Sequence, residues 1–301
     1  MKKIVLLFIL ALPLGAMAQS DTTYWNKGGG LGLNFNQATL SNWAAGGNNS
    51  ISGAGYFNVF FDYKKDRVIW NNSLDMGMGF IKNEGEEERK ADDRFVFISN
   101  YGKRFKAKDY WYFSAALDFR TQLAKGYGTD ENQTGYISKF LAPAYMLASI
   151  GLDWKPNDFF NVSFGLASGK FTFVNDKKLS DAGAFGVDEG SKSRSELGGT
   201  IKANLNKEIM KNVQYKSSLI LFSNYLENAD KIDVNWENTI TMKINDILSA
   251  NIYNQLIYDY DVKFYDTDLT GADILETESE KWQFKNIIAL GLTVKFGGVR
   301  K

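Results

Sequence analysis

The sequence predicts an all-β protein: a transmembrane up-and-down antiparallel β-barrel of about 12 strands, with both termini at its periplasmic end. Three observations lead to this fold class. Apolar and polar residues alternate with a period of two along nearly the whole chain. Short and long connections alternate between the segments that show this pattern. Beyond residue 18, no uninterrupted apolar stretch reaches the roughly 18 residues of a membrane helix.

The N-terminal segment has the three parts of a secretory signal peptide. Two lysines follow Met1, Ile4–Leu14 is an apolar run too short to span a bilayer, and Ala16–Ala18 gives the small-x-small cleavage pattern. No Cys follows, which excludes a lipoprotein anchor. We therefore expect residues 1–18 to be removed and residues 19–301 to form a single outer-membrane barrel domain.

Residues 281–296, KWQFKNIIALGLTVKF, show the alternation most clearly. Phe284, Ile288 and Leu290 fall on one face and the lysines on the other, with Asn286 as the polar exception on the apolar face. No helical period persists in such windows, so each is expected to be a strand. The expected strands cover residues 29–37, 50–64, 68–81, 93–105, 109–124, 143–154, 158–174, 194–206, 212–226, 231–245, 249–265 and 281–296.

The connections between these strands alternate in length. Short ones include KKDR at 64–67 and KPND at 155–158, whereas 82–92, 125–142 and 175–193 are long. Short turns at one end and long loops at the other are typical of an up-and-down barrel. An even number of strands brings both termini to the short-turn end, which we expect to be periplasmic.

Alternation alone does not tell whether the apolar face points inward, as in a soluble barrel, or outward to lipid. Many expected strands have about 13–16 residues, more than the 9–11 that cross a membrane. Charges recur on the second face, aromatic residues such as Trp70 and Trp111 stand at strand ends, and Phe296 lies near the C-terminus. Only a closed barrel satisfies every backbone group in lipid. We therefore expect a polar lumen and a location in the bacterial outer membrane.

Two segments carry a family resemblance. LGLNFNQATLSNWAAGGNNSISG (31–53) and FDYKKDRVIWNNSLDMGMGF (61–80) resemble an uncharacterised outer-membrane β-barrel family of Bacteroidetes, catalogued as domain of unknown function 3078. The run LSNWAAGG and the hairpin joined by KKDR are its most recognisable parts. The resemblance extends over essentially the whole mature chain, 19–301. It implies an outer-membrane barrel and implies no activity, ligand or site residue.

The composition excludes several kinds of chemistry. The chain has no Cys and no His, so disulfides, thiol catalysis and a Ser-His arrangement are all unavailable. Lys and Arg number 35 and Asp and Glu number 35, which leaves no net field that would favour nucleic acid. The run GGGLG (28–32) is no dinucleotide fingerprint because no helix follows it. We expect no enzyme activity, no cofactor and no metal site.

Charged residues on the polar face are the candidate lumen-lining residues. They line either a water-filled path with opposed acidic and basic walls or a salt-bridged interior that holds a narrow barrel in shape. Asp259 and Asp261 lie two apart and are interpreted as hydrated lumen carboxylates rather than a catalytic pair. The candidates are Asp75, Asp118, Arg120, Glu237, Lys243, Asp259 and Asp261, with Asp153, Glu196, Lys202, Asp233, Lys285 and Lys295 on the same face.

Three long loops need an interpretation. The acidic loop NEGEEERKADD (83–93) is expected to be a solvated run of charge because it lacks an EF-hand spacing. The loop 175–193 carries lysines that can meet lipopolysaccharide phosphates. The first extracellular loop lies within TLSNWAAGGNNSIS (39–52), and its tryptophan can point outward as an interfacial anchor or inward as a constriction. Its candidate residues are Asn42, Trp43, Gly46 and Gly47.

Twelve strands lie between packed eight-stranded barrels and open porins of 16–18 strands. We therefore expect a narrow passive channel for small hydrophilic solutes. The alternative is a non-conducting structural or partner-binding barrel whose lumen is plugged by loops. The expected partners are outer-membrane lipid and lipopolysaccharide, the barrel-assembly machinery during insertion and, for the alternative, another envelope protein. No nucleic acid is expected.

Overall fold

The structure, a computed structural model, describes residues 24–39, 49–106, 109–127, 135–268 and 275–298. For Ala38 and for residues 263–268 and 275–279 it describes the backbone alone. The signal segment lies outside the described residues, as do Asn42, Trp43, Gly46 and Gly47 of the first long loop. The two interpretations of Trp43 therefore remain predictions.

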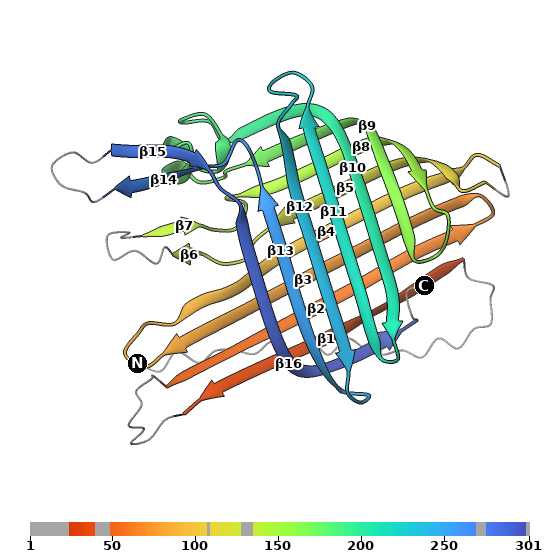
Figure 1. Ribbon diagram of the computed structural model, residues 1–301, viewed down its shortest axis with the longest axis horizontal. Coiled ribbons are helices and arrows are strands. Elements are labelled where there is room, and N and C mark those ends of the chain that lie inside the picture. Colours follow the sequence, from red (N-terminus) through yellow and green to blue (C-terminus); the bar gives the residue numbers. More distant parts are fainter. Residues whose placement is uncertain (1–23, 40–48, 107–108, 128–134, 269–274, 299–301) are drawn as a thin grey trace.

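Twelve antiparallel strands close into a barrel in the order β1-β16-β13-β12-β11-β10-β9-β8-β5-β4-β3-β2 (Figure 1). The predicted all-β fold and its strand number are confirmed. Consecutive barrel strands are neighbours throughout, so the barrel is an up-and-down meander. The strands are β1 (Trp25–Ala38), β2 (Ser50–Lys65), β3 (Val68–Asn83), β4 (Arg89–Arg104), β5 (Trp111–Thr121), β8 (Ala144–Trp154), β9 (Phe160–Phe173), β10 (Ser193–Met210), β11 (Val213–Asn224), β12 (Ile232–Lys243), β13 (Leu248–Tyr258) and β16 (Gln283–Gly297).

The apolar face of the strands points outward. On β16, Phe284, Ile288 and Leu290 are all exposed, whereas Lys285 between them belongs to the inner face, where its ammonium binds Asp92 of β4. Other strands repeat the pattern, and few large apolar side chains of the barrel wall are buried. The barrel therefore has an apolar outer surface and a polar interior.

Aromatic side chains form a band at the short-turn end of the outer surface. The ring of Trp25 at the start of β1 lies 5.2 Å from that of Tyr63 and 5.9 Å from that of Trp70. Further round the barrel, Trp111 and Trp154 lie 6.4 Å apart. Such a band is typical of the interface between membrane and water.

The long connections contain short elements of their own, which the sequence pattern did not predict. Two small hairpins, β6 (Gly126–Tyr127) with β7 (Tyr136–Ser138) and β14 (Lys263–Asp268) with β15 (Leu275–Glu280), stand at the long-loop end (Figure 1). The predicted strand 249–265 is accordingly wrong at its end, because the barrel strand stops at Tyr258. Among the described residues, no helix is long and apolar enough to span a membrane.

A small apolar cluster organises two of the long loops. The helix α1 (Lys177–Asp181) and the 3-10 turn η1 (Ala184–Gly186) lie between β9 and β10. Leu179 and Val187 of this loop are buried with Val174 and with Ala142 from the loop before β8. The Asp176 carboxylate caps α1 by accepting from the Leu179 N–H at 3.0 Å, and it also accepts from the Tyr136 hydroxyl at 2.8 Å. The two loops are therefore one folded unit, named here the loop cap.

The closing strand β16 is paired unevenly. It pairs with β13 from Gln283 to Leu292, but with β1 only from Gly291 to Gly297. On its other side, β1 pairs with β2 over its full length, Trp25–Ala38. The ladder that closes the barrel is therefore complete only towards the short-turn end.

Candidate functional site

The interior of the barrel holds charged side chains that meet across the lumen. Four of them, the central cluster, come from β5, β10 and β12. Arg120 donates to Asp118 at 2.7 Å and to Glu237, and the Lys202 ammonium lies 3.3 Å from Asp118. Four strands separate β5 from β12 on the shorter way round the barrel, so the Arg120–Glu237 ion pair spans the lumen. Two cations here face two carboxylates.

A second group, the mouth cluster, lies nearer the long-loop end. The Lys170 ammonium of β9 contacts Asp233 at 2.5 Å and Asp259 at 2.8 Å. It also lies 3.6 Å from Glu196, which is 7% exposed. Arg194 of β10 pairs with Asp261 at 2.7 Å and lies 3.8 Å from Glu196. Two cations here face four carboxylates, so this part of the lumen has an excess of negative charge.

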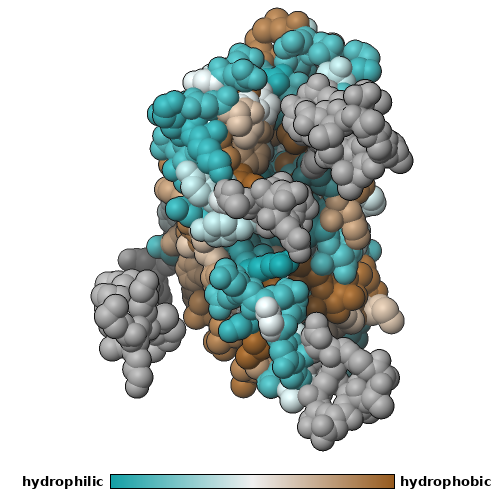
Figure 2. Space-filling view, turned by 90° about the vertical axis from the view of Figure 1, so that its left-hand side faces the viewer, coloured by the Kyte–Doolittle hydropathy of each residue, from teal (hydrophilic) through white to brown (hydrophobic). Residues whose placement is uncertain are grey.

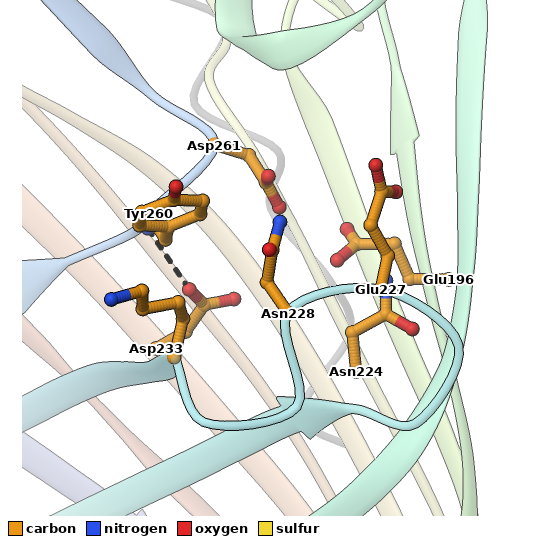
Figure 3. Close-up of a pocket in the computed structure, with 8 residues that line it drawn as sticks. Glu196, Asn224, Glu227, Asn228, Asp233, Tyr260 and Asp261 are labelled. Atoms are coloured by element: carbon orange, nitrogen blue, oxygen red, sulfur yellow. Dashed lines mark hydrogen bonds between the residues drawn. The ribbon is translucent and has the colours of Figure 1, made fainter.

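The mouth cluster borders a small polar pocket (Figure 3). Glu227 and Asn228 of the β11–β12 connection join it, with the Asn228 side chain turned towards Asp261. The Tyr260 N–H donates to Asp233 at 3.1 Å and fixes the connection that follows β13. Seen from the long-loop end, hydrophilic residues gather over the mouth while hydrophobic residues cover the flanks (Figure 2). The pocket itself is lined mostly by acidic and amide side chains.

Three carboxylates of this pocket lie close enough to share a cation. Glu196, Asp233 and Asp261 place one oxygen each within 4.8 Å of one another. Lys170 and Arg194 already contact the same carboxylates, however, and balance part of their charge. We therefore assign no metal to this group.

The structure brings together five of the seven candidate lumen residues. Asp118, Arg120 and Glu237 form the central cluster, and Asp259 and Asp261 belong to the mouth cluster. Asp259 and Asp261 follow the end of β13 instead of lying within a strand. The remaining two candidates are Asp75 and Lys243.

Asp75 stands two strands from Arg120, in register with it through Val96 of β4, whereas Lys243 stands at the end of β12. Asp75 stands on β3 opposite Asn58 of β2 and Val96 of β4. Lys243 is the last residue of β12, at the short-turn rim, where its exposed ammonium binds Asp246 at 2.7 Å. Lys243 therefore lies at the rim, away from both clusters.

Sequence reasoning missed Lys170 and Asp92, both of which lie next to strand irregularities. A register shift on β9 between Gly165 and Ser168 changes which residues face inward. Leu166 before the shift faces outward and Lys170 after it faces inward, although a strict period of two would put both on the same face. The expected acidic loop 83–93 is shorter than predicted, because β4 begins at Arg89 and takes in Asp92. A strict alternation of inward and outward residues, continued across either irregularity, therefore assigns the wrong face to the residues beyond it.

Comparisons with known proteins give a match to one family model over part of the chain, and a likeness to solved structures. Residues 35–127 match the model of a family described as a protein of unknown function, DUF3078. Two segments, 31–53 and 61–80, carry the resemblance found in the sequence. The match includes the second segment in full and the first from residue 35 onwards. No curated protein matches the chain.

Solved outer-membrane structures are similar to the chain at low identity. The COG4313 outer membrane channel from Pseudomonas putida F1 is 10% identical with a TM-score of 0.40, over 93% of this chain and 98% of that one. The translocator domain of the autotransporter NalP from Neisseria meningitidis is 9% identical with a TM-score of 0.37, over 92% and 90%. Salmonella typhi OmpF, in complex with daunomycin, is 10% identical with a TM-score of 0.29, over 90% and 97%.

Proposed function

We propose that this chain is an outer-membrane β-barrel that passes small hydrophilic solutes through a narrow, ion-paired lumen. The observation that carries the proposal is the division between the two faces of the wall. Apolar side chains cover the outside, and charges of both signs line the inside. A polar interior within an apolar band suits a water-filled path through lipid.

The central cluster sets the expected width of this path. Arg120 and Glu237 meet from nearly opposite walls, so a solute passes beside this ion pair or displaces it. The lumen is accordingly expected to conduct weakly and to exclude large solutes. The excess of carboxylates in the mouth cluster favours cations at the entrance.

A non-conducting barrel is the second candidate, and the same ion pair favours it. If Arg120, Glu237 and the side chains around them fill the cross-section, the charges serve to hold the barrel in shape. The short-turn end, where β1 begins and β16 ends, is expected to face the periplasm in both cases.

Planar lipid bilayers distinguish the two candidates. The refolded protein, with folding checked by its heat-modifiable migration on gels, should give discrete conductance steps in a potassium chloride solution. Reversal potentials across a salt gradient should show a preference for potassium over chloride. Folded, inserted protein that stays silent at high voltage would support the non-conducting barrel and reject the channel.

A further inference from the structure

The barrel wall has an open seam between its first and last strands. The ladder between β1 and β16 stops at the pair Asn34–Gly291. Beyond it, Phe35–Ala38 of β1 bond only to β2, and Gln283–Leu290 of β16 pair only with β13. The two strands diverge towards the long-loop end (Figure 1). Within the described part of the chain, one half of the closing ladder is therefore missing.

Such an edge needs water or a ligand beside it. Backbone N–H and C=O groups without partners are too costly to face hydrocarbon, and irregular backbone at membrane depth is tolerated where it adjoins protein or a water-filled cavity. The seam is therefore expected to be continuous with lumen water. Its outer rim is apolar, because Ile288 is 75% exposed and Phe35 is 64% exposed.

A group of polar side chains, named here the latch, lies on the inner side of the seam. Lys285 of β16 binds Asp92 of β4, which is 4% exposed. The Arg94 guanidinium lies 5.3 Å from the Tyr56 ring of β2 and 5.4 Å from the Tyr253 ring of β13. Because β2 and β4 lie on one side of the seam and β13 and β16 on the other, the latch bridges the opening from within.

The latch has unused hydrogen-bonding capacity. Asp92 Oδ2 and Arg94 Nε are two of the three buried side-chain polar atoms without a hydrogen-bond partner among the described residues. Lys285 is paired with Asp92. Arg94 lies between two tyrosine rings, and no carboxylate of the described residues is within ion-pair distance of it. The Arg94 Nε–H, a buried guanidinium donor, therefore has no acceptor among the described residues.

We propose that the seam is a lateral portal for an amphipathic monoanion. The hydrocarbon part enters between β1 and β16 from the bilayer, and the anionic head, a carboxylate or a phosphate, meets Arg94 in the latch. An anion at this place supplies the missing acceptor to Arg94 in a charge-assisted hydrogen bond. The apolar rim formed by Phe35 and Ile288 stays in contact with the hydrocarbon. This inference rests on the membrane location proposed above and adds a second, lateral route to the barrel.

Disulfide trapping tests whether the seam is open. The natural chain has no Cys, so introduced pairs are unambiguous. Leu33 and Leu292 are paired across the ladder and lie on the outer face. If the ladder continued in the same register, Phe35 would lie opposite Leu290 on that face. Oxidation should cross-link L33C/L292C at least about tenfold faster than F35C/L290C, because a disulfide needs Cα atoms within about 7 Å. Equal rates would show a closed ladder and overturn the proposal.

Fluorescence quenching tests what enters. A bimane attached to A289C, on the inner side of the seam, should be quenched by 16-doxyl-stearate in the bilayer at least about threefold more than a bimane on S218C, which faces the lumen from β11. Equal quenching at the two positions would contradict lateral entry.

The head group is tested with the same label. Quenching by the doxyl-stearate anion should exceed quenching by a doxyl-labelled alkyltrimethylammonium, and R94M should remove that difference while leaving the quenching by the cation unchanged. No preference in the wild type would overturn the role of Arg94, even if R94M failed to fold. Bimane labels that stay shielded in a barrel that inserts and conducts would reject the portal alone, whereas failure to insert would reject the membrane location itself.

Discussion

The central cluster and the mouth cluster are built from the same types of charged side chain but differ in their charge balance. In the central cluster, Arg120 and Lys202 face two carboxylates, and every charge has a partner. In the mouth cluster, Lys170 and Arg194 face four carboxylates, so negative charge remains. A balanced pair across the lumen restricts its width, whereas an unbalanced group near the mouth changes the local concentration of ions. In the proposed channel, size selection and charge selection would thus belong to different levels of the barrel.

Removing the pair that spans the lumen should have the largest effect. R120A/E237A deletes two long side chains from opposite walls, and we expect single-channel conductance to rise at least about threefold because the lumen is widened without a change in net charge. The double variant is preferred because removing one partner alone leaves a buried charge unpaired. D153A/K155A, an ion pair of 3.4 Å near the short-turn end, is the matched control. Unchanged conductance in R120A/E237A would mean that the constriction lies elsewhere.

Neutralising the mouth should change selectivity and leave width alone. In D259N/D261N, two carboxylates become neutral amides of nearly the same size, so Lys170 and Arg194 then face two carboxylates. The potassium-to-chloride permeability ratio should fall by about two- to threefold, with the conductance at high salt nearly unchanged because salt screens the mouth charge. Reversal potentials in a salt gradient measure the ratio. D246N, at the short-turn rim, is the control.

The fold could be predicted further than the site. Alternation placed all 12 barrel strands because each strand has one apolar and one polar face, and this period of two can be read locally in the sequence. It also put Arg120 and Glu237 on the inner face. It could not show that these two residues meet, because their contact depends on how β5 and β12 lie across the lumen. Nor could it find Lys170, because the irregularity in β9 resets the alternation.

The loop cap beside the mouth should respond to acid through Asp176. Hydrogen bonding from the Lys139 ammonium lowers the pKa of Asp176 to about 2. A carboxyl group with a lowered pKa stabilises the folded loops above its unfolded pKa, and this stabilisation is lost as the pH falls towards about 2.

Pepsin cleavage measures that loss. In the wild type, cleavage within 175–193 should increase between pH 4 and pH 2. D176N should be cleaved readily throughout this range, whereas D181N, which loses only an exposed ion pair with Lys177, should follow the wild type. Conductance at neutral pH, set by the central cluster, should change little in D176N. If the wild type and D176N were cleaved alike across this pH range, Asp176 would not be the residue that stabilises the loop cap.

The smallest effect is expected from a substitution of Lys202. This variant tests how far the central cluster depends on one contact. K202M removes an ammonium 3.3 Å from Asp118, but Arg120 still binds that carboxylate at 2.7 Å and still reaches Glu237. Because the contact across the lumen survives, we expect conductance to change by less than about 1.5-fold, with a slight gain in cation preference from the lost positive charge. Single-channel recordings beside R120A/E237A provide the measurement. A change as large as that of the double variant would mean that the restriction depends on the charge balance of the whole cluster and that the Arg120–Glu237 pair is only one part of it.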